Sequence, residues 1–344
     1  MKQSLHPTFP SYNPTGPYSP ADLPIDDQGR VYHLQIKPEQ LAPDILLVGN
    51  PGRADFIGST FFKDIETHHQ HRGLISVTGI ADAVDQRITM IAPLRSSVVT
   101  SGMGTPSLKI IVNELVLLNE VDFSTLTRKP EFPRLHILRL GTSGALQVTT
   151  PLGTPIITTY AIGLDNTGLF YDAPYPDDNC QRMESDLSTL FQQKINSKSR
   201  FEKKIHPYVS RAYPKMVTVL WDAAQQLGVP VKRGLTVSCP GFFAPQGRDV
   251  VRIQPSIPDI DQLFSDLEVG LDGQQVENME MEASFLLHFL GGLGYCAGAI
   301  CPTIANRRQN TFDSNYQESI YNTTRIALQA LADLRAQEKN CFKM

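Results

Sequence analysis

The sequence lacks features that would place it among secreted or metal-stabilised proteins. Its five cysteines are odd in number, widely scattered and without C-x-x-C spacing, which argues against a disulfide framework and against a zinc site. The first 30 residues lack an apolar core of the signal-peptide type, because prolines punctuate short polar stretches there. Both absences predict a protein of the reducing cytoplasm.

A dominant charge is missing too. The chain has 31 basic and 35 acidic residues, a formal net charge of -4, so no overall positive field attracts nucleic acid or an acidic membrane. Nor is there an unbroken hydrophobic span, since Gly291, Gly292 and Gly294 divide the most apolar stretch, residues 283–304, into a predicted buried helix and a strand. We expect no nucleic acid and no membrane as partners, and any anion site has to be local.

What the chain does have is enough apolar sequence for one large core: 344 residues, 41% of them hydrophobic. Residues 1–30 are predicted to be a disordered proline-rich tail and residues 31–344 a single domain. Strand-like runs alternate with helical patterns, which predicts a single three-layer α/β domain with a mixed central β-sheet flanked by helices. Strands are expected at 31–36, 44–48, 74–78, 87–92, 98–101, 137–140, 155–160 and 234–238, and helices at 183–195, 201–205, 216–227 and 313–338, with others beginning near residues 54 and 105.

One stretch, residues 137–144, indicates an anion site. A short apolar run ends at a glycine, two hydroxyl residues and a second glycine (I-L-R-L-G-T-S-G). Taken by itself, such a G-T-S-G loop is more often an ordinary turn after a strand. Arg139 changes the balance, because an arginine in an otherwise apolar buried strand is costly unless it meets an anion. Its planar fork of donors, next to hydroxyls and closely approachable backbone, suits a phosphate-like group.

A second glycine loop follows the strand expected at residues 44–48. Its sequence is G-N-P-G-R, and a helical pattern starts directly after it. The amides at a helix N-terminus, strengthened here by Arg53, form a natural phosphate seat. The loop is neither G-x-G-x-x-G nor a P-loop, so its motif indicates neither dinucleotide nor ATP binding.

Arg72 is a third candidate anion contact, and it follows His68, His69 and His71. Three histidines so close together invite a metal interpretation. No cysteine or carboxylate lies at ligand spacing nearby, so we interpret the segment as a solvated basic turn and expect no metal.

Two further stretches allow both a structural and a functional interpretation. Phe242, Gln246 and Arg248 could stack on a flat ring and bond its edge, although two packed phenylalanines in a loop are the commoner arrangement. Glu280 and Glu282 precede the apolar helix, where carboxylates could cap the helix or accept hydrogen bonds from hydroxyl groups. The residues alone leave these alternatives open.

Together these motifs resemble the nucleoside phosphorylase family, and within it the members that cleave uridine. The matching motifs are V-Y-H-L, V-G-N-P-G-R, H-R-G, S-G-M-G-T-P-S, L-R-L-G-T-S-G-A, Q-G-R and M-E-M-E-A-S. The resemblance runs from about residue 31 to 336 and fails at 121–134, which looks like an insertion, and for much of 174–211. It implies reversible phosphorolysis of uridine to uracil and ribose 1-phosphate. No cofactor is implied, since inorganic phosphate is a co-substrate.

The resemblance also implies roles for individual residues. Catalysis would rest on Arg139, Gln246, Arg248 and Glu282. Phosphate would be held by Gly49, Arg53, Arg72, Arg139 and Thr142, with Arg72 reaching in from a neighbouring subunit. The ribose would contact His33, again from the neighbour, together with Met281 and Glu282. The base would lie among Ser143, Gly144, Phe242, Gln246, Arg248 and Ile304. A homodimer would therefore be the minimal active unit, with a hexamer as the larger alternative.

The sequence departs from the family pattern in three places. Gly73 stands where relatives often carry the glutamate of a monovalent-cation site, Met279 replaces an aromatic residue, and Asn50 replaces an aspartate of the phosphate loop. Purine-cleaving relatives place an aspartate near Asn306, and its absence favours a pyrimidine.

The alternative functions are a purine nucleoside phosphorylase, a nucleoside hydrolase of the same fold and a nucleoside-binding protein without catalysis. Hydrolysis would not need three phosphate-binding arginines, so the set speaks against a hydrolase.

Overall fold

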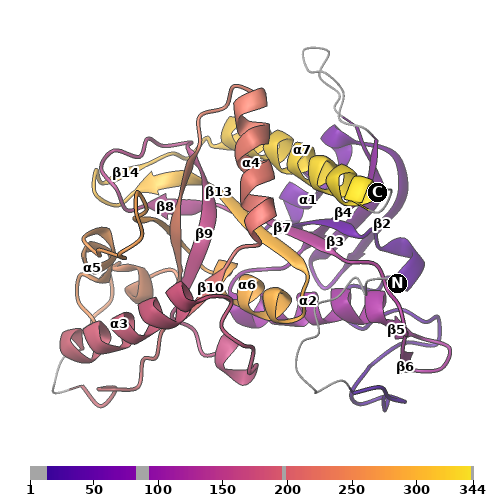
Figure 1. The fold of residues 1–344 in the computed structure, drawn as a ribbon, viewed down its shortest axis with the longest axis horizontal. Coiled ribbons are helices and arrows are strands. Elements are labelled where there is room, and N and C mark those ends of the chain that lie inside the picture. Colours follow the sequence, from indigo (N-terminus) through magenta and orange to yellow (C-terminus); the bar gives the residue numbers. More distant parts are fainter. Residues whose placement is uncertain (1–13, 83–92, 196–198, 342–344) are drawn as a thin grey trace.

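The computed structural model describes residues 14–82, 93–195 and 199–341, and its centre is a large mixed β-sheet (Figure 1). The sheet has 12 strands among the described residues. In sheet order they are β10 (Tyr208–Arg211), β9 (Pro155–Gly163), β11 (Lys232–Ser238), β12 (Val276–Glu280), β8 (Ser143–Ala145), β13 (Cys296–Asn306), β7 (His136–Leu140), β1 (Asp44–Val48), β4 (Leu94–Thr100), β3 (Leu74–Ala81) and β2 (Phe62–His71), and β14 (Thr311–Phe312) pairs with β13. The short strands β5 (Val121–Asp122) and β6 (Thr127–Arg128) form a separate pair.

Helices cover both faces of the sheet, which makes three layers (Figure 1). On one face lie α1 (Pro51–Phe61), α4 (Pro214–Gln226) and α7 (Gln317–Cys341), and on the other lie α2 (Thr105–Glu120) and α6 (Ala283–Gly292). Two more, α3 (Asp178–Lys194) and α5 (Ile260–Ser265), pack around β9, β11 and β12. Short 3-10 helices occur at η1 (Pro38–Gln40), η2 (Gly168–Phe170) and η3 (Ala244–Gln246). The predicted three-layer α/β architecture is confirmed.

The central strands explain why this architecture forms. β13, β7, β1 and β4 run parallel to one another, and every residue of β1 is buried, as expected for a parallel strand covered on both faces. Alternate residues join opposite cores: Leu46 and Val48 pack with α1 and α7, whereas Ile45 and Leu47 pack with α2 and α6. The same alternation in β7 directs Arg139 to the face of α2 and α6.

One half of the sheet closes on itself. β9 pairs with β11, β11 with β12, β12 with β8, β8 with β13, and β13 pairs back with β9. A separate apolar cluster, which includes Leu235, Val237 and Phe264, packs around this ring. This closure brings the ends of β11 and β12 next to those of β13 and β7. The side chains that follow these four strands therefore lie close together.

Most of the predicted elements are confirmed. The strand at 44–48 matches β1, the apolar stretch 283–304 forms α6 and β13, and the helices expected at 183–195, 216–227 and 313–338 correspond to α3, α4 and α7. Among the described residues, no helix is both long and apolar enough to cross a membrane. The strand expected at 87–92 lies outside the described residues.

Two predicted elements are wrong. Residues 31–36 form no strand; Val31 makes only an isolated bridge to Ile25, and Glu114 instead binds the backbone N–H groups of His33 and Leu34. Their alternating burial comes from this tertiary anchoring and not from sheet pairing. Residues 201–205, expected to be helical, instead form a turn at 201–203 followed by irregular backbone.

Residues 14–30 belong to the predicted disordered tail, and the structure places them against the domain. Leu23 is buried, and the backbone N–H of Tyr18 donates to the carbonyl of Leu126 at 2.8 Å. The backbone N–H of Arg128 donates in turn to the carbonyl of Thr15 at 3.0 Å. Residue 31 is therefore no structural boundary, because part of the tail packs on the β5–β6 segment.

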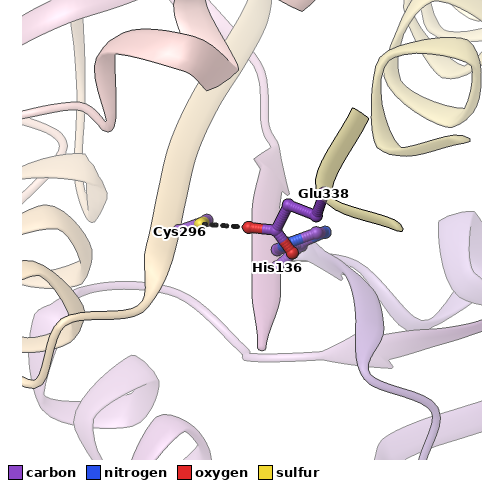
Figure 2. Close-up of side chains that lie close together, drawn as sticks. All are labelled: His136, Cys296 and Glu338. Carbon is purple, nitrogen blue, oxygen red and sulfur yellow. Dashed lines mark hydrogen bonds and ion pairs between the residues drawn. The ribbon is translucent and has the colours of Figure 1, made fainter. Parts of the chain in front are cut away.

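At the amino ends of the central strands lies a group of charged side chains around His136 (Figure 2). Ligand-type atoms of His136, Cys296 and Glu338 lie within 4.8 Å of one another. Both ring nitrogens of His136 are already bound to carboxylates, Nδ1 to Asp44 at 2.9 Å and Nε2 to Glu338 at 3.0 Å, and Arg335 also binds Asp44. Carboxylates only accept, so the ring carries both protons and the group is a network of ion pairs rather than a set of free metal ligands.

This network should make stability depend on pH. Burial opposes the charge on His136, but hydrogen bonds to Asp44, Cys296 and Glu338 raise its pKa to about 10. In the unfolded chain the pKa is about 6.5, so the stabilisation is complete below about pH 6.5 and is lost as the pH rises to about 10. We predict that the difference in melting temperature between the wild type and His136→Gln shrinks over this range. A difference that stays constant in calorimetric scans across the range would contradict the assignment.

Candidate active site

A cavity of about 820 Å³ opens at the carboxyl ends of β7, β1 and β4. These strands are adjacent and parallel, so the loops that follow them meet at one edge of the sheet, where ligands of open α/β sheets usually bind. Each loop contains glycine: Gly49 after β1, Gly102 after β4 and Gly141 after β7, and all of them line the cavity.

The structure brings nearly all the predicted site residues to this one cavity. It is lined by Gly49, Arg53, Arg72, Arg139, Thr142, Ser143, Gly144, Phe242, Gln246, Arg248, Met281, Glu282 and Ile304. Arg72, expected from a neighbouring subunit, lines the cavity of its own chain, and its guanidinium also donates to the hydroxyl of Tyr32 at 3.0 Å. That these residues would share one site was predicted from the sequence. Their individual roles stay predictions.

His33 is the exception, because it is not among the residues that line the cavity. Its Nδ1 bonds Glu114 at 2.7 Å, and its carbonyl accepts a bond from His71 at 3.1 Å. Glu114 lies in α2 and is buried, so it ties the His33 segment to the helix whose N-terminus lies at the cavity.

Arg139 carries the buried cation of the site. Its side chain is 4% exposed; Nε donates to Glu280 at 2.9 Å and Nη2 donates to Glu282. Burial opposes its charge, but Glu282 and Glu280 raise the pKa of Arg139, so the guanidinium stays protonated. Nη1 is buried and has no hydrogen-bond partner among the described residues. A buried donor without a partner costs about 1–3 kcal/mol, so Nη1 marks the place for an acceptor from a ligand.

Arg53 adds a second cation to the same end of the cavity. It lies in the first turn of α1, where Asn50 caps the helix by accepting a bond from the Arg53 backbone N–H at 3.2 Å. The amide of Asn50 therefore performs the capping that an aspartate would perform. Burial and, after it, the charge of Arg139 lower the pKa of Arg53, and both arginines line the cavity. Two cations and a helix N-terminus form an electrostatic environment for a dianion.

The sequence left open whether Glu280 and Glu282 cap the apolar helix or accept hydrogen bonds from a ligand, and in the structure the two residues differ. Glu280 accepts bonds from the backbone N–H groups of Glu282 and Ala283, both at 2.9 Å, and so caps the start of α6. Glu282 instead lies against the cavity, with Oε1 accepting from the N–H of Gly104 at 2.5 Å and Oε2 from Arg139. Burial raises the pKa of Glu282, although Arg139 opposes that change. Lone pairs on this carboxylate remain for hydroxyl groups of a ligand.

The Gly102–Gly104 loop makes this contact possible. Gly102 and Gly104 adopt φ values of 71° and 82°, a region that favours glycine. A Cβ on Gly102 would lie 2.3 Å from Oγ of Ser107, so the loop could not keep its path with a larger residue. The tight turn delivers the Gly104 N–H to Glu282.

The other end of the cavity holds the predicted base-reading residues. The guanidinium of Arg248 lies 3.8 Å from the ring centroid of Phe242 and donates to Oε1 of Gln246 at 2.6 Å. A guanidinium can only donate, so Gln246 must present its oxygen to Arg248 and its Nε2 elsewhere. Burial and the charge of Arg307 lower the pKa of Arg248. This end of the cavity therefore combines an aromatic ring, that of Phe242, with the hydrogen-bond donors of Gln246 and Arg248.

Arg307 and Tyr316 also line the cavity, although the sequence analysis did not predict them as site residues. Arg307 packs over Gly144 and donates to the carbonyl of Gly247 at 3.1 Å, so it connects β13 to the loop of Gln246. Two consecutive arginines at the carboxyl end of an apolar strand were the available signal. Tyr316 comes from the segment before α7 and had no local signal.

Asn306 also lines the cavity, but its polar atoms are used inside the protein. Its Nδ2 donates to the carbonyls of Gln147 and Thr150, at 3.0 and 2.8 Å, and its Oδ1 accepts from the backbone N–H groups of Arg308 and Gln309. The residue therefore joins two loops and has no free group that points to a base.

The Phosphorylase superfamily model matches residues 43–335 of the chain. The chain is 26% identical to a uridine phosphorylase of Thermococcus kodakarensis over 94% of both proteins. A DeoD-type purine nucleoside phosphorylase of Listeria welshimeri is 30% identical, but over only 38% of this chain and 46% of its own.

Solved structures give the same comparison at the level of the fold. A nucleoside phosphorylase of Trypanosoma brucei that shows uridine phosphorylase activity superposes with a TM-score of 0.79 and 26% identity, covering 91% of this chain and 100% of its own. A purine nucleoside phosphorylase of Toxoplasma gondii has a TM-score of 0.63 and 19% identity, covering 91% and 99%, which is a likeness of fold.

The anion end can be tested with inorganic phosphate. Arg53→Met should weaken phosphate binding about ten- to a hundredfold, because a hydrogen bond to a charged group contributes about 1.5–3 kcal/mol. Titration calorimetry without any nucleoside measures the change. Arg95→Met is the matched control, since Arg95 pairs with Glu66 on the surface and does not line the cavity. Equal affinities for the two variants would remove Arg53 from the anion site.

Proposed function

The chain belongs to the phosphorylase superfamily, and on that basis we propose that it is a uridine phosphorylase, a pentosyltransferase that converts uridine and phosphate to uracil and ribose 1-phosphate. One observation carries the proposal: Arg139, whose buried Nη1 has no hydrogen-bond partner among the described residues, lines the same cavity as the Gln246–Arg248 pair. The first is complementary to a phosphate oxygen and the second to the edge of a pyrimidine. Glu282 lies next to the cation and can accept the hydroxyls of the sugar that joins them.

The chemistry requires positioning and charge rather than a covalent nucleophile. Arg139 and Arg53 hold the phosphate dianion against the anomeric carbon, and Glu282 holds the ribose hydroxyls. As the glycosidic bond lengthens, the sugar becomes oxocarbenium-like and the departing uracil becomes an anion. Phosphate then adds to the face of the sugar opposite the base.

Arg248 and Gln246 act on the leaving group. With Oε1 of Gln246 turned to Arg248, its Nε2 and the remaining guanidinium N–H groups are donors for carbonyl oxygens of uracil, where the developing negative charge resides. Because Arg248 stacks on Phe242, its plane is fixed before the base arrives. Donors aimed in advance at the developing charge stabilise the transition state more than the bound substrate.

Asn306 supports a pyrimidine rather than a purine as the base. Its side-chain polar groups bond loops of the protein, and the carboxylates that line the cavity among the described residues, Glu280 and Glu282, are paired with Arg139, so none is placed to carry a proton to a purine ring nitrogen. Two or more arginines at the phosphate end support phosphorolysis over hydrolysis, because water needs no such cluster.

The active unit that we propose is a homodimer in the cytoplasm. His33 is held by Glu114 outside the cavity of its own chain, and its ring is 28% exposed, so it is available to the 5′-hydroxyl of a nucleoside in a neighbouring subunit. A symmetric dimer would complete both sites at once. A contribution of Arg72 in trans stays a prediction, and larger assembly is not required by this arrangement.

The proposed reaction predicts strict dependence on phosphate. Uridine incubated with the protein should release uracil in phosphate buffer and show no release above background in a phosphate-free buffer. The change in ultraviolet absorbance on uracil release measures the rate. Release at equal rates in the two buffers would indicate hydrolysis, and faster cleavage of inosine than of uridine would indicate a purine enzyme.

The base assignment predicts the effects of two substitutions. Arg248→Ala should lower the turnover of uridine about a hundredfold or more, because the uracil anion loses its cationic donor, while the KM for phosphate should change little. Gln246→Ala should reduce the preference for uridine over other nucleosides, because discrimination depends on the unpaired partner that a wrong base leaves behind. Steady-state kinetics with uridine, thymidine and inosine test both. Wild-type uridine kinetics in both variants would exclude this pair as the base-reading residues.

A further inference from the structure

The direction of the free Arg139 donor depends on Glu280. Arg139 has few ways to turn, because Nε is bound to Oε2 of Glu280 and Nη2 to Glu282. Glu282 also has to serve the ligand, whereas both oxygens of Glu280 accept from protein donors, Oε1 from Ser238 and Ala283 and Oε2 from Arg139 and the backbone of Glu282. The plane of the guanidinium, and with it the direction of Nη1, is therefore set by how firmly Glu280 is held.

Among the described residues, the hydroxyl of Ser238 is the one side-chain donor to Oε1 of Glu280, which also accepts from the backbone N–H groups of Glu282 and Ala283. Ser238 is the last residue of β11, lies opposite Glu280 in the sheet and is fully buried. Its Oγ donates to Oε1 of Glu280 at 2.5 Å and accepts a bond from the backbone N–H of Ser284 at 2.8 Å. Since a hydroxyl has one hydrogen, this pattern fixes its orientation: the hydrogen points to the carboxylate and a lone pair points to α6.

The anchor continues one step further from the cavity. The hydroxyl of Ser284 donates to Oδ2 of Asp165 at 3.2 Å, and the hydroxyl of Tyr208 donates to the same oxygen at 2.8 Å. Asp165, Tyr208 and Ser284 are all buried. Ser238 therefore sits between a rigid polar group behind α6 and the carboxylate that orients Arg139.

We propose that Ser238 is a positioning residue of the phosphate site: it fixes Glu280 and thereby aims the free donor of Arg139 into the cavity. This role depends on the proposed function in one respect only, namely that the bound anion is phosphate. Ser238 does not line the cavity and touches no substrate position, so it acts through Glu280. Without its hydroxyl, Glu280 loses a donor, and the N–H of Ser284 loses its acceptor. The carboxylate and the start of α6 then gain freedom, and Nη1 loses its fixed direction.

A graded pair of substitutions tests this proposal. Ser238→Ala removes the hydroxyl, and Ser238→Cys keeps a weak donor and acceptor of similar size. Ser210→Ala is the matched control, because Ser210 is equally buried and its hydroxyl donates to the carbonyl of Ser284 at 3.0 Å, on the side away from Glu280. Thermal melting reports the structural cost of each change. Calorimetric titration of inorganic phosphate into the protein without nucleoside reports the anion site.

The two ends of the cavity should respond differently. Ser238→Ala should weaken phosphate binding and raise the KM for phosphate about tenfold, as expected when a preorganised charged donor is lost in part, while the inhibition constant of uracil stays within about twofold. Ser238→Cys should fall between Ser238→Ala and the wild type, and Ser210→Ala should bind phosphate like the wild type even if it melts at a lower temperature.

The proposal is overturned if Ser238→Ala binds phosphate normally, if Ser210→Ala weakens it equally, or if phosphate and uracil binding fall in parallel. Should Ser238→Ala fail to fold, Ser238→Cys against Ser210→Ala decides by the same comparison. A wild type that binds phosphate but releases no uracil from uridine would refute the proposed function, and the phosphate titrations would still judge the role of Ser238.

Discussion

A guanidinium enclosed in a β-sheet has to be surrounded by acceptors, and the requirement of Arg139 for them organises this active site. The cost of removing an ion from water is several kcal/mol, so a buried arginine persists only where anions and hydrogen bonds replace the water. Glu280 and Glu282 bind Nε and Nη2 of Arg139, which lines the cavity, and Nη1 is buried without a hydrogen-bond partner among the described residues. Because Nη1 has no acceptor, the site favours an anion that can supply one.

The topology of the sheet supplies the remaining groups. Parallel strands β7, β1 and β4 end at one edge, so their glycine loops and the N-terminus of α1 face the same volume. Closure of the other half of the sheet brings the ends of β11 and β12 to that edge. Because of this closure, Glu280 and the loop of Gln246 reach the cavity from the far side, and Ser238 lies behind Glu280 without lining the cavity. One end of the cavity is therefore cationic and the other combines an aromatic ring with hydrogen-bond donors, which suits a phosphate and a base joined by a sugar.

The sequence identified site residues where a short stretch of residues carried the chemical signal by itself. Arg139 could be recognised because a charged residue interrupts an apolar run, and the loop of Arg53 because a strand, a glycine loop and a helix follow one another. The separate tasks of Glu280 and Glu282 could not be read, since they depend on Gly104 and Ser238, which are distant in sequence. Residues 31–36 imitated a strand because Glu114 buries alternate positions through contacts that no local pattern contains. Ser238 itself is one ordinary serine at the end of a strand.

The central claim is that phosphate, held by Arg139, attacks the sugar directly from the face opposite the base. The most direct measurement is the anomeric configuration of the first sugar product formed from uridine, followed by proton and phosphorus nuclear magnetic resonance. A single displacement inverts the anomeric centre, so the account predicts α-ribose 1-phosphate in an amount equal to the uracil released. Free ribose as the initial product would show that water is the nucleophile. The β-anomer would show a covalent intermediate, and either result would contradict the account.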